Sequence, residues 1–217
     1  MNIILLGAPA SGKGTQAEML AKKYGLYLLQ TGELSRNLAK KDARIKKIID
    51  SGKLIPQEEM TMYVLDFLHS KKENLKDILF EGFPRFISQY EALEKFLKSK
   101  GDDIDGVISL DVSEKEAVKR ISSRRTCVKC GKVFNTITNP APGGKCGCGG
   151  NLTQREDDKP EAVKIRFQYY RENTKELIDY LDGLGKLVRV NGERSIDDIQ
   201  KDLISIVDRF KADEKSR

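Results

Sequence analysis

The sequence contains no apolar run close to the roughly 20 residues that a membrane-spanning helix needs. The apolar segment at its start, residues 1–6, is short and leads directly into glycine. It also lacks the basic residues and the cleavage site of a secretory signal. We therefore expect residues 1–6 to form a strand, and we expect a cytoplasmic chain with no membrane partner.

Cysteine is absent outside one short stretch, which holds all four: Cys127, Cys130, Cys146 and Cys148. In a cytoplasmic chain this clustering favours a metal site over disulfides. The pairs Cys-x2-Cys and Cys-x-Cys have nearly the spacing of a structural zinc site with four thiolate ligands. The tighter second pair leaves alternatives open: another ligand at one position, a metal-free reduced module, or a redox pair.

A long block of basic residues is also missing, although the net charge is +6 and the pI is near 9.0. Scattered lysines favour solvated helix faces, with arginines facing small polyanions, over a nucleic-acid surface. A zinc-ribbon module that binds nucleic acid stays the non-enzyme alternative. Between the cysteine pairs, however, only Lys132, Phe134 and Lys145 would serve it. We expect no nucleic-acid partner.

Short apolar segments alternate with segments of helical periodicity along the 217 residues. We expect strands over residues 3–6, 26–30, 77–81, 106–110 and 186–190. We expect helices over residues 13–24, 33–51 with a break near Asp42, 57–70, 88–99, 114–125, 160–181 and 196–210. This alternation predicts an α/β fold, a doubly wound five-stranded parallel sheet with helices on both faces. Residues 126–152 are rich in glycine and cysteine and should form a small inserted module.

A glycine-rich motif, Gly7-x4-Gly12-Lys13, lies between the first predicted strand and the first predicted helix. In that context backbone N–H groups and the helix N-terminus hold phosphates, and the lysine reaches the outer ones. The hydroxyl residue of the motif, Thr15, comes one position late because Gly14 follows Lys13. A glycine-rich turn without phosphate binding is the alternative, which the full spacing and the lysine disfavour. The motif predicts a P-loop NTPase-type core.

Residues 7–16, Gly-Ala-Pro-Ala-Ser-Gly-Lys-Gly-Thr-Gln, resemble the adenylate kinases, a family of nucleoside monophosphate kinases, and the resemblance covers nearly the whole chain. It implies a core of residues 1–29, 60–123 and 160–217. It also implies a small helical AMP-binding insertion, residues 30–59, and a zinc-bearing lid, residues 124–159. The family usually has glycine where Ala10 stands, and we expect the loop to function with alanine. The ATP-binding loop residues it implies are Ala10, Ser11, Gly12, Lys13, Gly14 and Thr15.

Two further segments contain residues suited to a second phosphate. Thr31 and Arg36, five residues apart at a helix start, can hold one phosphate, although an N-cap and a solvated arginine are the alternative. Arg85 follows the third strand, where doubly wound sheets place ligands. The resemblance assigns the AMP site to Thr31, Arg36, Lys53, Leu54, Ile55, Gly82, Phe83, Pro84, Arg85, Gln89, Arg155 and Arg166. Glu81 stands where the family usually has the aspartate that orients magnesium-bound water, and its role stays open.

Arginines flank the cysteine module. Arg120 and Arg124 are expected on one face of the helix over residues 114–125, and Asp157 and Asp158 are expected to pair with arginines when the module closes. Phosphoryl transfer needs cations in place of a general base, because the acceptor phosphate is already ionised at neutral pH. The resemblance assigns Arg120, Arg124, Val133, Phe134 and Arg194 to ATP, and Arg155 and Arg166 to both nucleotides. The expected catalytic set is Lys13, Arg85, Arg124, Arg155 and Arg166.

The resemblance implies magnesium-dependent, reversible transfer of the terminal phosphoryl group of ATP to AMP, giving two ADP. A monomer with a structural zinc ion is expected. A UMP or CMP kinase and a GTP-dependent AMP kinase are the alternatives within enzymes. A signalling GTPase is not supported, because no Asn-Lys-x-Asp motif for guanine is present.

Overall fold

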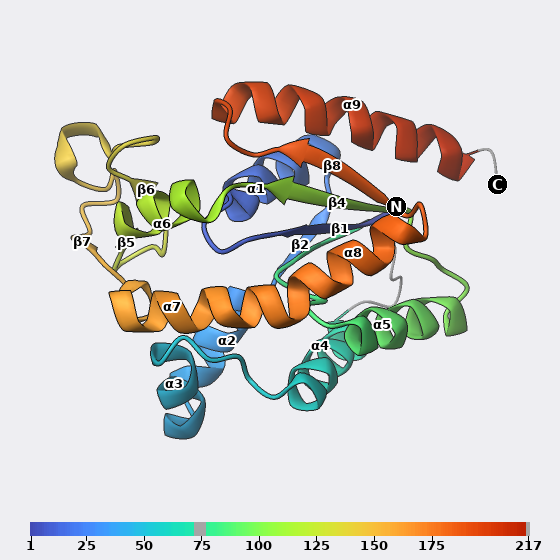
Figure 1. Ribbon diagram of the computed structural model, residues 1–217, viewed down its shortest axis with the longest axis horizontal. Helices are drawn as coiled ribbons and strands as arrows, with labels where there is room; N and C mark the ends of the chain where they lie inside the picture. The colour runs from blue at the N-terminus through green and yellow to red at the C-terminus, as the bar shows by residue number, and fades with distance from the viewer. Residues whose placement is uncertain (72–76, 216–217) are drawn as a thin grey trace.

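A parallel sheet forms the centre of the computed structural model, which describes residues 1–71 and 77–215 (Figure 1). Its strands are β1 (Asn2–Gly7), β2 (Tyr27–Gln30), β3 (Ile78–Glu81), β4 (Gly106–Asp111) and β8 (Leu187–Asn191). Their order is β2-β3-β1-β4-β8, and every neighbouring pair is parallel. The predicted α/β fold with a five-stranded parallel sheet is confirmed.

Helices cover both faces of this sheet because side chains alternate between the faces of each strand. Ile4 and Leu6 of β1 belong to the apolar cluster beneath α4 (Gln57–Lys71), α5 (Ile87–Ser99) and α8 (Lys175–Gly183). Ile3 and Leu5 belong to the cluster beneath α1 (Lys13–Tyr24) and α9 (Ile196–Lys215). Figure 1 shows these two layers on opposite sides of the sheet. The buried, apolar strands thus determine where the loops at their carboxyl ends lie.

Two smaller parts project beside the carboxyl ends of the strands (Figure 1). The first contains α2 (Thr31–Ala39) and α3 (Ala43–Asp50). Asp42 caps α3 by accepting hydrogen bonds from the backbone N–H groups of Arg44 and Ile45, so the predicted break near Asp42 is confirmed. The helical pattern resumes at α4 after Pro56.

The second projection is an antiparallel sheet of β5 (Arg124–Cys127), β6 (Val133–Asn135) and β7 (Leu152–Thr153), in the order β6-β5-β7. Two 3-10 turns, η1 (Pro142–Gly144) and η2 (Glu156–Asp158), follow β6 and β7 respectively. Cys127, Phe134 and Cys146 are its buried side chains. So small an apolar centre is consistent with a module that needs a metal to fold.

The prediction of a helix over residues 114–125 is wrong at its end. Helix α6 (Glu114–Ser122) stops early, and Arg124 lies in β5, where it pairs with Asn135 of β6. The side-chain amide of Asn135 donates to the carbonyl oxygen of Arg120 at 2.9 Å. That carbonyl is the one that a longer helix would need for the N–H of Arg124. Arg120 and Arg124 therefore do not share a helix face.

The helix predicted over residues 160–181 contains a π turn and ends later than expected. It consists of α7 (Pro160–Tyr169), a π segment η3 (Tyr170–Thr174) and α8. The N–H of Lys175 bonds to the carbonyl of Tyr170, five residues earlier, and the Asn173 amide donates to the carbonyl of Tyr169 at 3.0 Å. The remaining predicted elements agree to within a few residues. Within the described residues, no helix combines the length and the apolar character required to cross a bilayer.

Candidate functional site

The loop between β1 and α1 leaves backbone N–H groups available at a helix start. Gly7 approaches β4 so closely that a Cβ on it would lie 2.5 Å from the carbonyl oxygen of Leu110. Gly12 precedes α1 with a φ of 99°, and no side chain caps this helix end. The first turn of α1 also contains no acidic residue. An uncapped N-terminus with a positive partial charge is suited to bind an anion.

Lys13 is held at the centre of this loop. Its Nζ donates to the carbonyl oxygens of Gly7 at 2.8 Å and Ala8 at 2.7 Å. Burial lowers the pKa of Lys13 to about 8, against the opposing effect of the nearby Glu81 carboxylate. The guanidinium groups of Arg85, Arg166 and Arg124 lower the pKa of Lys13 further. The structure thus brings the P-loop lysine and three of the predicted catalytic arginines together, and Glu81 faces them.

Ala10 has a φ of 59°, in the left-handed region. This backbone explains why glycine is the usual residue there, since an L-residue in this region costs about 1–2 kcal/mol. Its methyl group packs beside the buried cluster of Ala117 and Phe167. The loop therefore keeps its shape despite the alanine.

Replacing Ala10 by glycine should raise the free energy of unfolding by up to about 1 kcal/mol, because it removes the left-handed alanine. Ala8 is the matched control, since it is buried and lies outside the left-handed region. Ala8→Gly should lower stability by about 0.5–1 kcal/mol. Urea unfolding of both variants measures the difference, and equal losses would contradict the assigned strain.

A second group of polar side chains lies at the ends of β2 and β3. Thr31 is buried, and a Cβ added at Gly82 would lie 2.7 Å from its Oγ1 and 3.3 Å from Nη2 of Arg85. Arg85 is fixed by its Nε, which donates to the carbonyl oxygen of Gly82 at 2.7 Å. Arg36 lies against Gly32 at the start of α2. A hydroxyl and two guanidinium groups thus lie against glycines, where a side chain would collide with them, and together they can donate hydrogen bonds to an anion.

Gln89 is buried, and both ends of its amide are occupied. Its Oε1 accepts from the backbone N–H of Arg85 at 2.9 Å, and its Nε2 donates to the carbonyl of Gln57 at 3.1 Å. In this arrangement Gln89 positions Arg85. Gln57 was missed by the sequence reasoning, because only its backbone takes part. Of the three residues predicted beside the base, Lys53 is exposed and Ile55 is buried.

A buried carboxylate joins two of the arginines near the lid. Asp158, with a fully buried side chain, accepts hydrogen bonds from Arg124 and Arg166. Asp157 accepts from Arg166 at 2.7 Å. The predicted pairing of Asp157 and Asp158 with arginines is confirmed. The pairs hold both guanidinium groups in fixed positions next to Lys13.

Arg155 differs from these arginines because no described carboxylate forms an ion pair with it. Its Nε donates to Oγ1 of Thr126 at 2.9 Å. Burial lowers the pKa of Arg155 to about 9, and the charges of Arg124 and Arg36 lower it further. The carboxylates of Asp157 and Asp158 oppose this lowering, and a bound anion would stabilise the charged form of Arg155 further. Thr126, which orients it, was missed by the sequence reasoning, because no pattern marks a hairpin threonine as a partner.

The residues predicted at the ATP base make their contacts in different parts of the structure. Arg120 donates to Glu116 at 2.9 Å and to the carbonyl of Gly192 at 2.7 Å. The side chain of Arg194 pairs with Asp202. The ring of Phe134 belongs to the buried centre of the antiparallel sheet, while Val133 is half-buried. The structure therefore ties Arg120 to the loop after β8 and does not bring these side chains into one cluster.

The four cysteines meet in one group. The Sγ–Sγ distances are 3.5 Å for Cys127–Cys148, Cys130–Cys146 and Cys146–Cys148, and all four Sγ atoms lie within 4.8 Å of one another. A tetrahedral zinc site with Zn–S bonds of about 2.3 Å needs sulfur atoms about 3.8 Å apart. All four residues, Cys148 included, thus fit one metal ion. The shorter second pair does not remove a ligand.

Comparison with known proteins agrees with this geometry. The adenylate kinase family model matches residues 5–186. The chain is 40% identical over 218 residues to the adenylate kinase of Archaeoglobus fulgidus, which covers 98% of this chain and 100% of that protein. It is 41% identical over 210 residues to the adenylate kinase of Caldicellulosiruptor bescii, covering 94% and 97%. The adenylate kinase of Thermosipho africanus is 40% identical over 215 residues, covering 96% and 100%. Matched over residues 5–186 by the family model and over 94–98% of its length by these relatives, the chain belongs to the adenylate kinase family.

Proposed function

We propose that this chain transfers the terminal phosphoryl group of ATP to AMP and forms two ADP, in a reversible reaction. One observation carries the proposal: Arg85, which lies beside Gly82, is also one of the three arginines near Lys13 of the P-loop. Two phosphate-binding groups sharing one cationic centre are suited to in-line transfer between two nucleotides. A hydrolase would need only the first of them.

We assign the donor phosphates to the loop residues Ala10, Ser11, Gly12, Lys13, Gly14 and Thr15. Thr31, Arg36 and Arg85 would hold the AMP phosphate, with residues 53–55, the Gly82–Pro84 turn and Gln89 around the rest of AMP. Arg124, Arg155 and Arg166 would stabilise the charge of the group in transfer. The ATP base would lie near Arg120, Val133, Phe134 and Arg194. The division into core, AMP-binding segment (residues 30–59) and lid (residues 124–159) is part of this proposal.

Adenylate kinases in general act on ATP with Mg²⁺, an ion that prefers oxygen ligands and retains several waters. Glu81 is the residue we propose to orient that hydrated ion, because its carboxylate faces Lys13 at the end of β3. The ion would neutralise phosphate charge on the donor. A monomeric state and a cytoplasmic location stay predictions.

The cysteine group is proposed to hold a structural zinc ion, since four thiolates close its coordination sphere. Chelation, or Cys148→Ser, should remove the metal and make residues 124–159 sensitive to protease, while the parallel sheet stays folded. Metal analysis, calorimetry and limited proteolysis measure this. A protein that lacks bound metal and resists protease equally with and without chelator would contradict the zinc assignment.

Binding of an ATP analogue should take up protons at pH near 8.5. Lys13 has a pKa of about 8 in the protein alone, and a polyphosphate beside it raises that pKa, so the lysine gains a proton on binding. Calorimetry in buffers of different ionisation enthalpy measures the uptake. Lys13→Met should lose most of it, with Arg155 supplying the remainder, whereas an unchanged uptake in that variant would contradict the assignment.

The activity is tested by initial rates of ADP formation with ATP or GTP as donor and AMP, UMP or CMP as acceptor. We expect ATP with AMP to be the fastest pair. A higher rate with UMP or CMP would replace the AMP assignment by that of another monophosphate kinase. A higher rate with GTP than with ATP would change the donor.

A further inference from the structure

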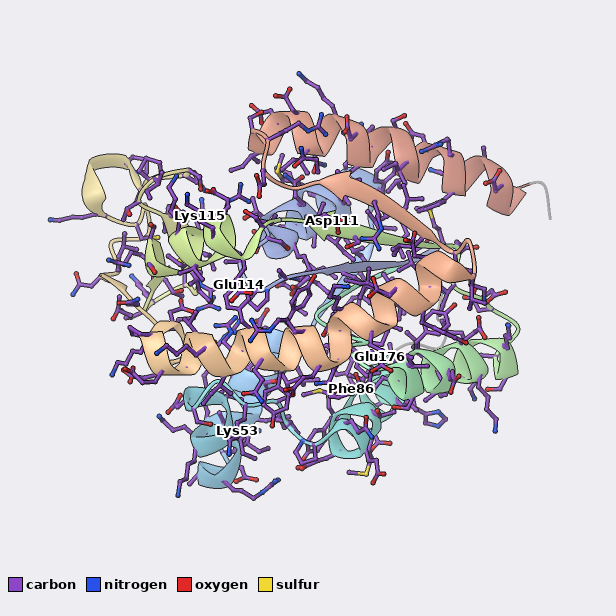
Figure 2. The ribbon with its side chains drawn as sticks, in the orientation of Figure 1. Lys53, Phe86, Asp111, Glu114, Lys115 and Glu176 are labelled. Atoms are coloured by element: carbon purple, nitrogen blue, oxygen red, sulfur yellow. The ribbon has the colours of Figure 1, made fainter. Side chains whose placement is uncertain are left out.

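The AMP-binding segment touches the first turn of α7, the helix that directly follows the lid, at one glycine. Gly52 is buried just after α3, with a φ of 81°. A Cβ added to it would lie 2.3 Å from the carbonyl oxygen of Ala162 and 2.9 Å from its Cα, in the first turn of α7. Because backbone meets backbone, no side-chain movement could relieve that overlap. Figure 2 labels the next residue, Lys53, beside α3.

Helix α3 also packs against η2, the turn that leads from the lid into α7. Each side carries a pair of opposite charges: Lys46 with Asp50 on α3, and Lys159 with Glu156 beside α7. Each pair contributes to the pKa of the lysine in the other pair. The pKa of Lys46 is raised mainly by Asp50 and further by Glu156, and the pKa of Lys159 mainly by Glu156 and further by Asp50. Each lysine thus lies within electrostatic range of the carboxylate on the opposite element.

The contact lies next to residues of both proposed nucleotide sites. Gly52 immediately precedes residues 53–55, which we place at the AMP site. Glu156 lies between Arg155, which we propose to act on the transferred group, and Asp157, which pairs with Arg166. A shift of the AMP-binding segment away from α7 would thus also remove support from the turn that places Arg155. Of these contacts, the one between α3 and η2 joins the AMP-binding segment to the lid itself.

We propose that the Gly52–Ala162 contact, with the charges of Lys46, Asp50, Glu156 and Lys159, couples the AMP-binding segment to the lid. Gly52 is then a positioning residue: binding of AMP favours the closed lid, and binding of ATP favours the closed AMP segment. The inference rests on the proposed function, because it assumes that each part covers one nucleotide. Coupling of this kind is reciprocal and typically changes affinity by about 5–150-fold.

The test is the affinity of a non-hydrolysable ATP analogue, measured by calorimetry with and without saturating AMP. In the unaltered protein AMP should tighten binding at least about fivefold. Gly52→Ala should reduce this factor to near one, while the analogue alone binds within about threefold of normal. Gly101→Ala is the matched control, because Gly101 has a φ of 73° and open space around its Cβ. It should keep the full coupling.

A second set of variants tests the charges if Gly52→Ala does not fold. Lys46→Glu combined with Asp50→Lys keeps the pair within α3 and the net charge, but sets like charges across the contact. Coupling should fall by about two- to fivefold at low salt and less at high salt. Adding Glu156→Lys with Lys159→Glu should restore it. Undiminished coupling in Gly52→Ala, or in the charge-reversed variant where Gly52→Ala does not fold, would overturn the inference, while ADP formation by the unaltered protein tests the proposed function separately.

Discussion

Lys13→Met should lower kcat for ADP formation by about 10²–10³-fold, the cost of losing a charge that stabilises the transferred group. The Nζ atom of Lys13 is the mobile cation of the P-loop and is held by the carbonyls of Gly7 and Ala8. Methionine keeps the length of the side chain and fills the same buried space. The variant should therefore fold normally, and its melting temperature should stay within a few degrees of that of the unaltered protein.

Lys22→Met is the control for this substitution, because Lys22 lies exposed on the same helix. It should keep full activity. Coupled-assay rates and thermal unfolding of the two variants separate a catalytic loss from a folding defect. If Lys13→Met retained more than about a tenth of the activity, the proposed role of the P-loop lysine would be wrong.

Arg155→Ala should lower kcat by about 10³-fold, comparable with the loss of an arginine that stabilises a phosphoryl group in transfer. The same change should not lower stability. Arg36 and Arg124 repel Arg155, whereas Asp157 and Asp158 attract it from a distance, and no described carboxylate forms an ion pair with it. Removing it relieves repulsion in the protein without nucleotides, so the melting temperature should be unchanged or higher. Activity and stability thus move independently at this position.

Arg209→Ala provides the comparison, since Arg209 is exposed on α9 and far from the proposed site along the chain. It should alter neither activity nor stability. Single-turnover rates and calorimetry measure both quantities. A fall in the melting temperature of Arg155→Ala together with nearly normal turnover would mean that this arginine supports the fold and not the transfer.

Much of the fold is predictable from local patterns. Segments such as residues 3–6 are continuously apolar, as buried parallel strands are. The glycine and the helical periodicity that follow predict where the strand ends. Neither of the two exceptions has a signal in the local sequence pattern. Helix α6 ends where Asn135 binds the carbonyl oxygen of Arg120. No residue near Ser122 predicts this helix end. Around the π turn at Tyr170–Thr174 the buried residues keep the spacing of an ordinary helix. The sequence pattern therefore does not predict the turn.

The proposed site was predictable where chemistry depends on residue type, and less so where it depends on backbone. Lys13 and the arginines could be chosen because phosphates require cations, and Asp158 because buried arginines require a partner. Gln57 acts through a carbonyl and Gly52 through a missing side chain. Gly52 is one of 18 glycines, and only the packing of α7 against it distinguishes it from the others. Its neighbours in sequence would suit any turn.

The most direct test of the two-nucleotide proposal is a phosphorus NMR time course of ATP, AMP and Mg²⁺ with the purified protein. Two ADP should form for each AMP consumed, without inorganic phosphate, and ADP alone should yield ATP and AMP until the same equilibrium ratio is reached. Release of inorganic phosphate with AMP unchanged would show an ATP hydrolase, and would contradict the transfer between two bound nucleotides.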